Sequence, residues 1–187
     1  LEIIDFPAEG IKLTEYTRRN NIGGDRTEGK GPTGEGNVIS GNGQWSGLQI
    51  YGSENTIKGN LIGTNAKGTN IHGNESAGIG LSGPRNIVGG TTIGEKNIVS
   101  GNHVGISIQG ENAIDNKIMG NFIGTDITGM KALGNDHGII IHSQATHNKI
   151  GGIEPEERNI VSGNIEKGVN IIRKGTAHNI IVGNFIG

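Results

Sequence analysis

Apolar and polar residues alternate in short segments that recur along the whole chain. Each segment begins with glycine and places two apolar residues two positions apart, as in Gly105-Ile106-Ser107-Ile108. Alternation with a period of two is typical of a β-strand that buries one face. The pattern therefore predicts six strands, which start at Gly10, Gly47, Gly78, Gly105, Gly138 and Gly168.

A second pattern, Asn-x-apolar-x-Gly, follows each of these strands and predicts another strand in every repeat. Its six copies start at Asn20, Asn55, Asn86, Asn116, Asn148 and Asn179. A third strand is indicated by the string Asn-(Ile/Val)-(Ile/Val)-Ser-Gly-Asn at 37–42, 97–102 and 159–164, with weaker equivalents that end at Asn74 and Asn135. After a longer first interval, the first two patterns recur every 27 to 33 residues. The chain therefore has about six repeats of about 31 residues, each with three short strands.

Three short strands per repeat, separated by turns, describe one rung of a parallel β-helix. Composition agrees, because 36 Gly, 31 Ile and 22 Asn make up nearly half of the 187 residues. Gly and Asn suit turns with positive φ, and Gly and Ile both disfavour a long helix. We therefore predict an all-β fold, a single parallel β-helix solenoid over 1–187, with rungs about 4.8 Å apart.

The segment NKIMGNFIGTDITGMKALGNDHGIII at 116–141 resembles the right-handed parallel β-helix repeats of the pectin-lyase-like superfamily. It is especially similar to the long repeat arrays of bacterial secreted and surface proteins, and the resemblance covers almost the whole chain. This resemblance implies a right-handed solenoid and an extracellular or cell-surface location. It does not choose a function, because the superfamily includes polysaccharide lyases, hydrolases, epimerases, phage tailspikes and non-enzymatic adhesins.

Charge and composition narrow the range of partners. The formal net charge is -2, so there is no basic surface of the kind that binds nucleic acid. No apolar run approaches the roughly 18 residues of a membrane-spanning helix. Without cysteine there is neither a disulfide framework nor thiol chemistry. We expect no nucleic-acid partner, no membrane span and no required cofactor.

The column of asparagines that opens the second pattern has two interpretations. One is a row of amides that bind sugar, and the other is an internal stack in which each amide bonds to its neighbours and to turn backbone. A complete column at a strand entrance favours the internal stack. The residue before each asparagine alternates in charge over Arg19, Glu54, Arg85 and Asp115, which predicts a charge ladder that helps to fix the register.

The same position continues with two histidines, so one carboxylate and two imidazoles stand on adjacent rungs. Asp115, His147 and His178 are therefore a candidate site for Zn²⁺ or a similar ion, and the alternative is three solvated side chains. No clear motif supports Ca²⁺, because the aspartates of the chain fall in different columns and rungs.

Asp136 and His137 lie in a turn just before a strand, with Lys131 nearby. An Asp–His pair beside a lysine can serve as general base and charge neutraliser for proton abstraction next to a uronate carboxylate. The pair is similar to the Asp/His turn of the mannuronan epimerases, although their fuller motif is absent. The alternative interpretation is an ordinary polar turn.

The few aromatic residues are also candidates. Trp45 precedes a strand and Tyr51 ends it on the outward side, so both rings could stack on sugar or contact a partner. Alternatively, Trp45 packs over a loop and Tyr51 fills a gap between rungs. Phe122 and Phe185 hold matching positions before Ile-Gly and are expected in the core. Residues 25–36 form a loop insertion, which can carry a grafted function or be merely mobile.

Neither end of the chain carries an evident polar cap, whereas a solenoid has to cover its terminal rungs. We therefore expect an excerpt of a longer repeat array, and the alternative is end-to-end self-association through uncapped rungs. The preferred function is a non-enzymatic secreted or cell-surface scaffold that is adhesive or binds carbohydrate, with a polysaccharide or a cell surface as partner. The alternative is a polysaccharide lyase or uronate epimerase that acts on acidic polysaccharide through Asp136, His137 and Lys131.

Overall fold

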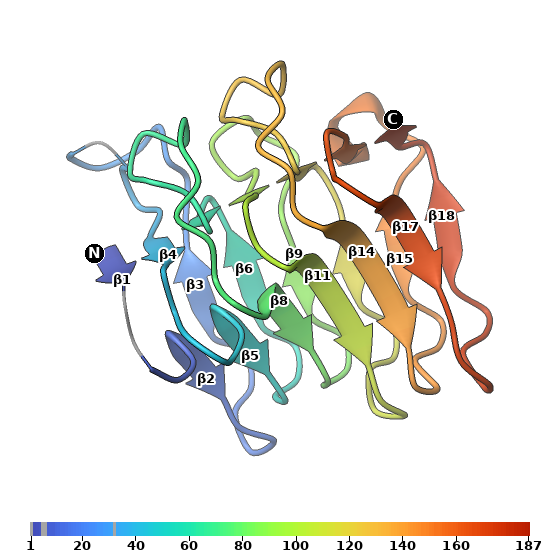
Figure 1. Ribbon diagram of the computed structural model, residues 1–187. Coiled ribbons are helices and arrows are strands. Elements are labelled where there is room, and N and C mark those ends of the chain that lie inside the picture. Colours follow the sequence, from blue (N-terminus) through green and yellow to red (C-terminus); the bar gives the residue numbers. More distant parts are fainter. Residues whose placement is uncertain (1, 5–6, 32) are drawn as a thin grey trace.

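Three parallel sheets run the length of the molecule (Figure 1). The third-strand segments predicted to end at Asn74 and Asn135 are wrong, because the strands of those rungs lie earlier, at Leu61–Ile62 and Phe122–Ile123. Sheet I consists of β2 (Ile11–Leu13), β5 (Leu48–Ile50), β8 (Ala77–Leu81), β11 (Val104–Gln109), β14 (His137–His142) and β17 (Lys167–Ile171). Sheet II consists of β3 (Asn21–Gly23), β6 (Thr56–Lys58), β9 (Ile87–Val88), β12 (Lys117–Ile118), β15 (Lys149–Gly151) and β18 (Ile180–Val182). Sheet III consists of β1 (Glu2–Ile4), β4 (Val38–Ser40), β7 (Leu61–Ile62), β10 (Ile98–Val99), β13 (Phe122–Ile123), β16 (Ile160–Val161) and β19 (Phe185–Ile186).

The structure is a computed structural model that describes residues 2–4, 7–31 and 33–187. The chain visits sheets I, II and III in turn, and each circuit forms one rung of a parallel β-helix, as the repeat spacing predicts. The one helical element of the described ranges is a 3₁₀ turn, η1 (Pro155–Glu157). Within those ranges no helix is long and apolar enough to cross a membrane.

Each rung buries the residues that the alternation places inward. In sheet I, Ile106 pairs with Ile79 of the preceding rung and with Ile139 of the next. These side chains are completely buried, as are Ile57 and Ile118 from sheet II. At about 1.5–3 kcal/mol for each buried Ile or Leu, the stacked columns stabilise the solenoid without disulfides.

A second, smaller apolar cluster lies on the outer side of sheet III, because the next residue of each of these strands belongs to the main core. Ala66 from the long loop 63–74 and Ile127 from the long loop 124–135 pack against it. The cluster is formed by Val38, Leu61, Ile98 and Phe122. One apolar residue from each long loop therefore packs on the outer side of sheet III.

The two phenylalanines that occupy matching positions have different environments. Phe122 is buried, as predicted, and the loop at Gly129 lies close against its ring. The prediction for Phe185 is wrong, because its side chain is 57% exposed. Phe185 lies on β19, the outermost strand of sheet III, where the guanidinium of Arg158 is 5.6 Å from the ring centroid.

Asparagine side chains form three continuous ladders along the molecule. The amide Nδ2 of Asn86 donates to Oδ1 of Asn116 one rung on, which also accepts the backbone N–H of Asn86, and Asn116 bonds to Asn148 in the same way. The first ladder confirms the internal stack, and the other two were not predicted. The members are Asn20, Asn55, Asn86, Asn116, Asn148 and Asn179; Asn37, Asn60, Asn97, Asn121, Asn159 and Asn184; and Asn42, Asn74, Asn102, Asn135 and Asn164.

Glycines stand where the third ladder approaches the backbone of sheet I. A Cβ at Gly47 would lie 2.8 Å from Nδ2 of Asn74, and a Cβ at Gly105 would lie 2.9 Å from Nδ2 of Asn135. Only glycine permits so close an approach. At Gly47 and Gly105, the glycine that begins the first sequence pattern is therefore required by the ladder beside it.

The residue before each asparagine of the first ladder has a left-handed backbone, with φ between 55° and 58°. Nε of Arg19 lies 2.7 Å from the carboxylate of Glu54, and Nη2 of Arg85 lies 3.3 Å from its other oxygen. The predicted charge ladder is confirmed for these three residues. Exposed pairs of this kind contribute only about 0–1 kcal/mol each, so their main effect is on register.

Arg26 fastens the insertion 25–36 to the loop 91–96, which lies two rungs away. Its guanidinium donates to the backbone carbonyl of Ile93 at 3.3 Å and to that of Lys96. The insertion 25–36 is therefore attached to the solenoid through Arg26, which is its second residue.

Candidate functional site

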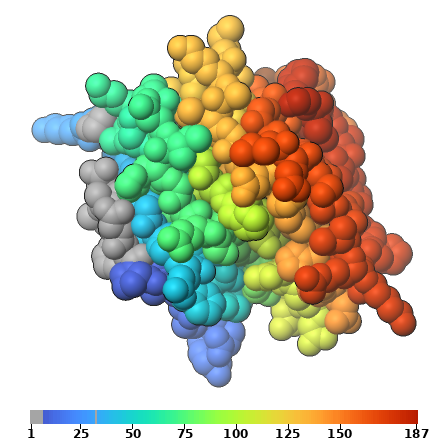
Figure 2. Space-filling model, in the orientation of Figure 1, coloured from blue at the N-terminus to red at the C-terminus, as the bar shows by residue number. Residues whose placement is uncertain are grey.

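Two clefts flank sheet I, one at each end of its strands. The first, which we call the isoleucine cleft, precedes β8, β11 and β14 and lies between the loops 63–74 and 124–135, which stand out from the surface in Figure 2. The second, the tyrosine cleft, lies where the same strands end. Their volumes are about 410 Å³ and 350 Å³.

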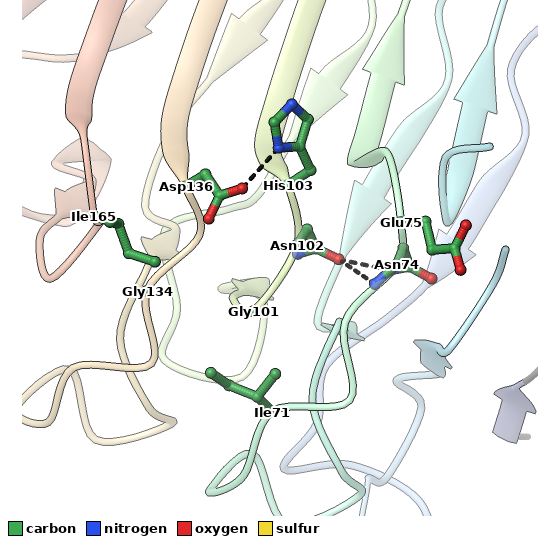
Figure 3. A pocket seen from close by; sticks show the side chains of 9 residues that line it. All are labelled: Ile71, Asn74, Glu75, Gly101, Asn102, His103, Gly134, Asp136 and Ile165. Carbon is green, nitrogen blue, oxygen red and sulfur yellow. Dashed lines mark hydrogen bonds and ion pairs between the residues drawn. The ribbon is translucent and has the colours of Figure 1, made fainter. Parts of the chain in front are cut away.

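The isoleucine cleft contains a histidine–carboxylate pair (Figure 3). Nδ1 of His103 lies 2.7 Å from Oδ2 of Asp136 on the next rung. The exposed side chains of Ile71 and Ile165 line the opening, and Glu75 lies one rung before His103. An Asp bonded to Nδ1 fixes the orientation of an imidazole, so the pair could support acid–base chemistry or bind a polar ligand.

The expected trio of Asp136, His137 and Lys131 does not share this cleft. Asp136 pairs with His103, and neither His137 nor Lys131 lines the cleft. The His137 ring lies 3.6 Å from the carboxylate of Glu166, and its Nδ1 is buried without a hydrogen-bond partner among the described residues. The isoleucine cleft therefore does not bring the trio together, and the trio's catalytic role stays a prediction.

His103 was missed from the sequence, although the sequence contains a signal for it. His103 follows Asn102 as Asp136 follows Asn135, and the two asparagines are consecutive members of the third ladder. Residues at equal distances from consecutive ladder positions lie side by side on adjacent rungs. Recognition of the third ladder would have placed the histidine next to the aspartate.

The tyrosine cleft differs in chemistry. Tyr51 is 39% exposed, and Nζ of Lys12 lies 5.7 Å from its ring centroid. The side chains of Gln109, Glu111 and Asn112 line the cleft and make no hydrogen bond or ion pair with any described residue. The cleft therefore combines an exposed aromatic ring with unpaired hydrogen-bonding groups. The sequence predicted the ring but not the three polar side chains.

Trp45 lies at the opposite end of β5 and is 56% exposed. Trp45 and Tyr51 are thus both accessible on one rung, as the ligand-contact interpretation requires. Between the two ends, the outer face of sheet I carries hydrogen-bonded polar groups. The hydroxyl of Ser107 is 3.2 Å from Nε2 of His142, whose Nδ1 is 2.8 Å from the hydroxyl of Ser143.

Burial of its imidazole, together with the charge of Arg173, lowers the pKa of His142 below its usual value. The ring is therefore neutral at pH 7, with one nitrogen that donates and one that accepts. Ser107 and His142 belong to the outward face of adjacent strands, β11 and β14. These two residues therefore present a hydroxyl and an imidazole to anything that lies along the face.

Asp115, His147 and His178, the candidate metal ligands, lie in one column but are not arranged around a common point. The rings of His147 and His178 stack with centroids 5.0 Å apart and an interplanar angle of 22°. Asp115 has the same left-handed backbone one rung earlier. Among the residues that the structure describes, no group of three or more His, Asp or Glu side chains is arranged to hold a metal ion. The geometry therefore gives the Zn²⁺ interpretation no support.

A scan against protein-family models finds no match, and searches of curated proteins and of solved structures find none either. The assignment of a function therefore depends on the chemistry of the two clefts and of the sheet between them.

Proposed function

We propose that the chain is a non-enzymatic scaffold of a secreted or cell-surface protein, and that it binds polysaccharide on the outer side of sheet I. The observation that carries this proposal is the tyrosine cleft, where an exposed ring stands beside three unpaired polar side chains. Sugars present apolar ring faces and many hydroxyls, so they match an aromatic ring flanked by amides and a carboxylate. The rigid parallel strands would hold these groups at fixed spacing for an extended polymer.

The first experiment is to incubate the chain with a panel of neutral and acidic polysaccharides, with and without Ca²⁺, and to record both binding and polymer length. Binding without shortening supports the proposal. In the binding arm, Tyr51→Ala should weaken affinity about 3- to 10-fold, because a stacked aromatic contributes about 0.5–1.5 kcal/mol. Tyr16→Ala is the matched control, since Tyr16 is 88% exposed and lies outside both clefts. Equal loss in both variants, or no binding to any polymer, would refute the proposal.

One observation favours the second candidate, a polysaccharide lyase or uronate epimerase. His103 and Asp136 form a close pair in an open cleft, which is the arrangement of a positioned general base. Under this alternative, acidic polymers would become shorter with new unsaturated uronate ends, or their uronates would be epimerised. Either product, if abolished by His103→Ala, would replace the scaffold proposal with an enzymatic one.

A further inference from the structure

The walls of the isoleucine cleft are aliphatic. Ile71 comes from the loop 63–74 and Ile165 from the turn before β17, and both side chains are exposed. Figure 3 shows Ile165 on the side of Asp136 and Ile71 on the opposite side, beyond Gly101. Single exposed aliphatic residues are common on protein surfaces, but two that line one cleft offer apolar surface to an occupant.

The floor of the cleft has little hydrogen-bonding capacity left for a ligand. Nδ2 of Asn74 donates to Oδ1 of Asn102 at 2.7 Å, and Nδ2 of Asn102 donates to Oδ1 of Asn135 at 3.0 Å. Both amides belong to the third ladder and are buried. A sugar placed here would find hydrogen-bonding partners only at the edge formed by Glu75, His103 and Asp136, and its other hydroxyls would face the two isoleucines. The cleft therefore suits an occupant whose polarity is confined to one end.

The charges of the cleft determine the sign of that polar end. The exposed carboxylate of Glu75 makes no hydrogen bond or ion pair within the described part of the chain. Figure 3 shows it turned away from His103 and Asp136, and rotation about its side-chain bonds can bring it over the cleft. Asp136 uses Oδ2 for His103, and its Oδ1 bonds to no described residue. An incoming cation would find two carboxylates with free oxygens.

We propose that the isoleucine cleft docks the lysine side chain of a partner protein. The four-carbon stem of a lysine packs between Ile71 and Ile165, and its ammonium donates to Asp136 and Glu75. An arginine fits less well, because its five planar donors would meet too few acceptors. This inference is independent of polysaccharide binding, which we assign to the tyrosine cleft.

The test is a titration of the chain with the peptide acetyl-Gly-Ser-Lys-Ser-Gly-amide, followed by NMR of the isoleucine methyl groups and the His103 ring. Saturable shifts of Ile71, Ile165 and His103 are expected with this peptide and not with its norleucine counterpart, which keeps the stem and lacks the charge. Glu75→Gln and Asp136→Asn should each weaken binding about two- to fivefold, as for a partly exposed ion pair. Glu111→Gln, which removes a carboxylate from the tyrosine cleft, should leave the affinity unchanged.

Three results would overturn the proposal. Equal shifts with the norleucine peptide would show a merely apolar groove. An affinity that neither Glu75→Gln nor Asp136→Asn alters would show that the carboxylates do not hold the ammonium. Saturation of the same methyl groups by a neutral oligosaccharide, with no response to the lysine peptide, would assign the cleft to sugar. An Ile165→Ser variant tests the wall separately, and its unfolding midpoint shows whether it remains folded.

Discussion

At the scale of single residues, one carboxylate organises the loop 124–135. Asp126 is only 4% exposed, and its Oδ1 accepts a hydrogen bond of 2.6 Å from the hydroxyl of Thr128. The same oxygen accepts the backbone N–H groups of Thr128, Met130 and Lys131. The Asp126 carboxylate thus bonds to residues of its own loop, and one of these bonds holds the backbone of Lys131 in place.

Asp126→Ala is expected to lower the free energy of unfolding by about 1–3 kcal/mol, because it removes the partly buried hydrogen bonds that the carboxylate accepts from Thr128, Met130 and Lys131. Asp126→Asn should cost less, since Asn65 accepts the N–H groups of Thr69 and Asn70 at the equivalent position of the other long loop. Urea unfolding of the three proteins at pH 7 checks the order of stabilities.

The same carboxylate should make stability depend on pH. Burial by itself raises the pKa of Asp126, but the hydrogen bonds from Thr128, Lys131 and Met130 together outweigh it and lower the pKa. Its contribution is then fully present above the unfolded pKa of about 3.9 and is lost as the pH falls through the lower folded value. Asp126→Asn should remove this part of the acid dependence between pH 5 and 2. An identical pH profile for wild type and variant would contradict the assignment.

At the scale of elements, the ladders and the strands depend on one another. Asn102 is buried on the third ladder, and its amide bonds to Asn74 and Asn135 and to backbone carbonyls. Asn102→Ala should lower the free energy of unfolding by about 3 kcal/mol or more, since several buried groups lose a partner at once. Asn170→Ala is the control, because the Asn170 side chain on β17 makes no hydrogen bond within the described part of the chain, and it should cost about 0.5 kcal/mol or less. Denaturant midpoints that shift equally would show that the ladder does not stabilise the fold.

The elements also show what sequence can and cannot predict. The alternation predicted sheet I because its strands are long enough to separate inward from outward positions. It could not assign the faces of β7, where Leu61 and Ile62 are both apolar and the strand has two residues. The outer cluster of sheet III and the isoleucine cleft both depend on the path of the long loops. A repeat period does not determine that path, and the cleft was therefore not predicted.

At the scale of the whole molecule, sheet I separates two clefts of different chemistry. The strand β11 has six residues, so its ends lie about 17 Å apart at a rise of about 3.3 Å per residue. The isoleucine cleft offers aliphatic walls and carboxylates, whereas the tyrosine cleft offers an exposed aromatic ring, two amides and a carboxylate. Because the parallel ladders make the sheet rigid, the solenoid can present two ligands at fixed separation.

Binding at the two clefts should therefore be independent. Substitutions more than about 7–10 Å apart that share no partners usually have additive effects. Tyr51→Ala should weaken polysaccharide binding and leave the lysine-peptide shifts at Ile71 unchanged, and Glu75→Gln should do the reverse. In the double variant, each affinity should equal that of the corresponding single variant within about a factor of two. A saturating polysaccharide that displaces the lysine peptide would show that one polymer spans both clefts, and this result would contradict the assignment of separate ligands.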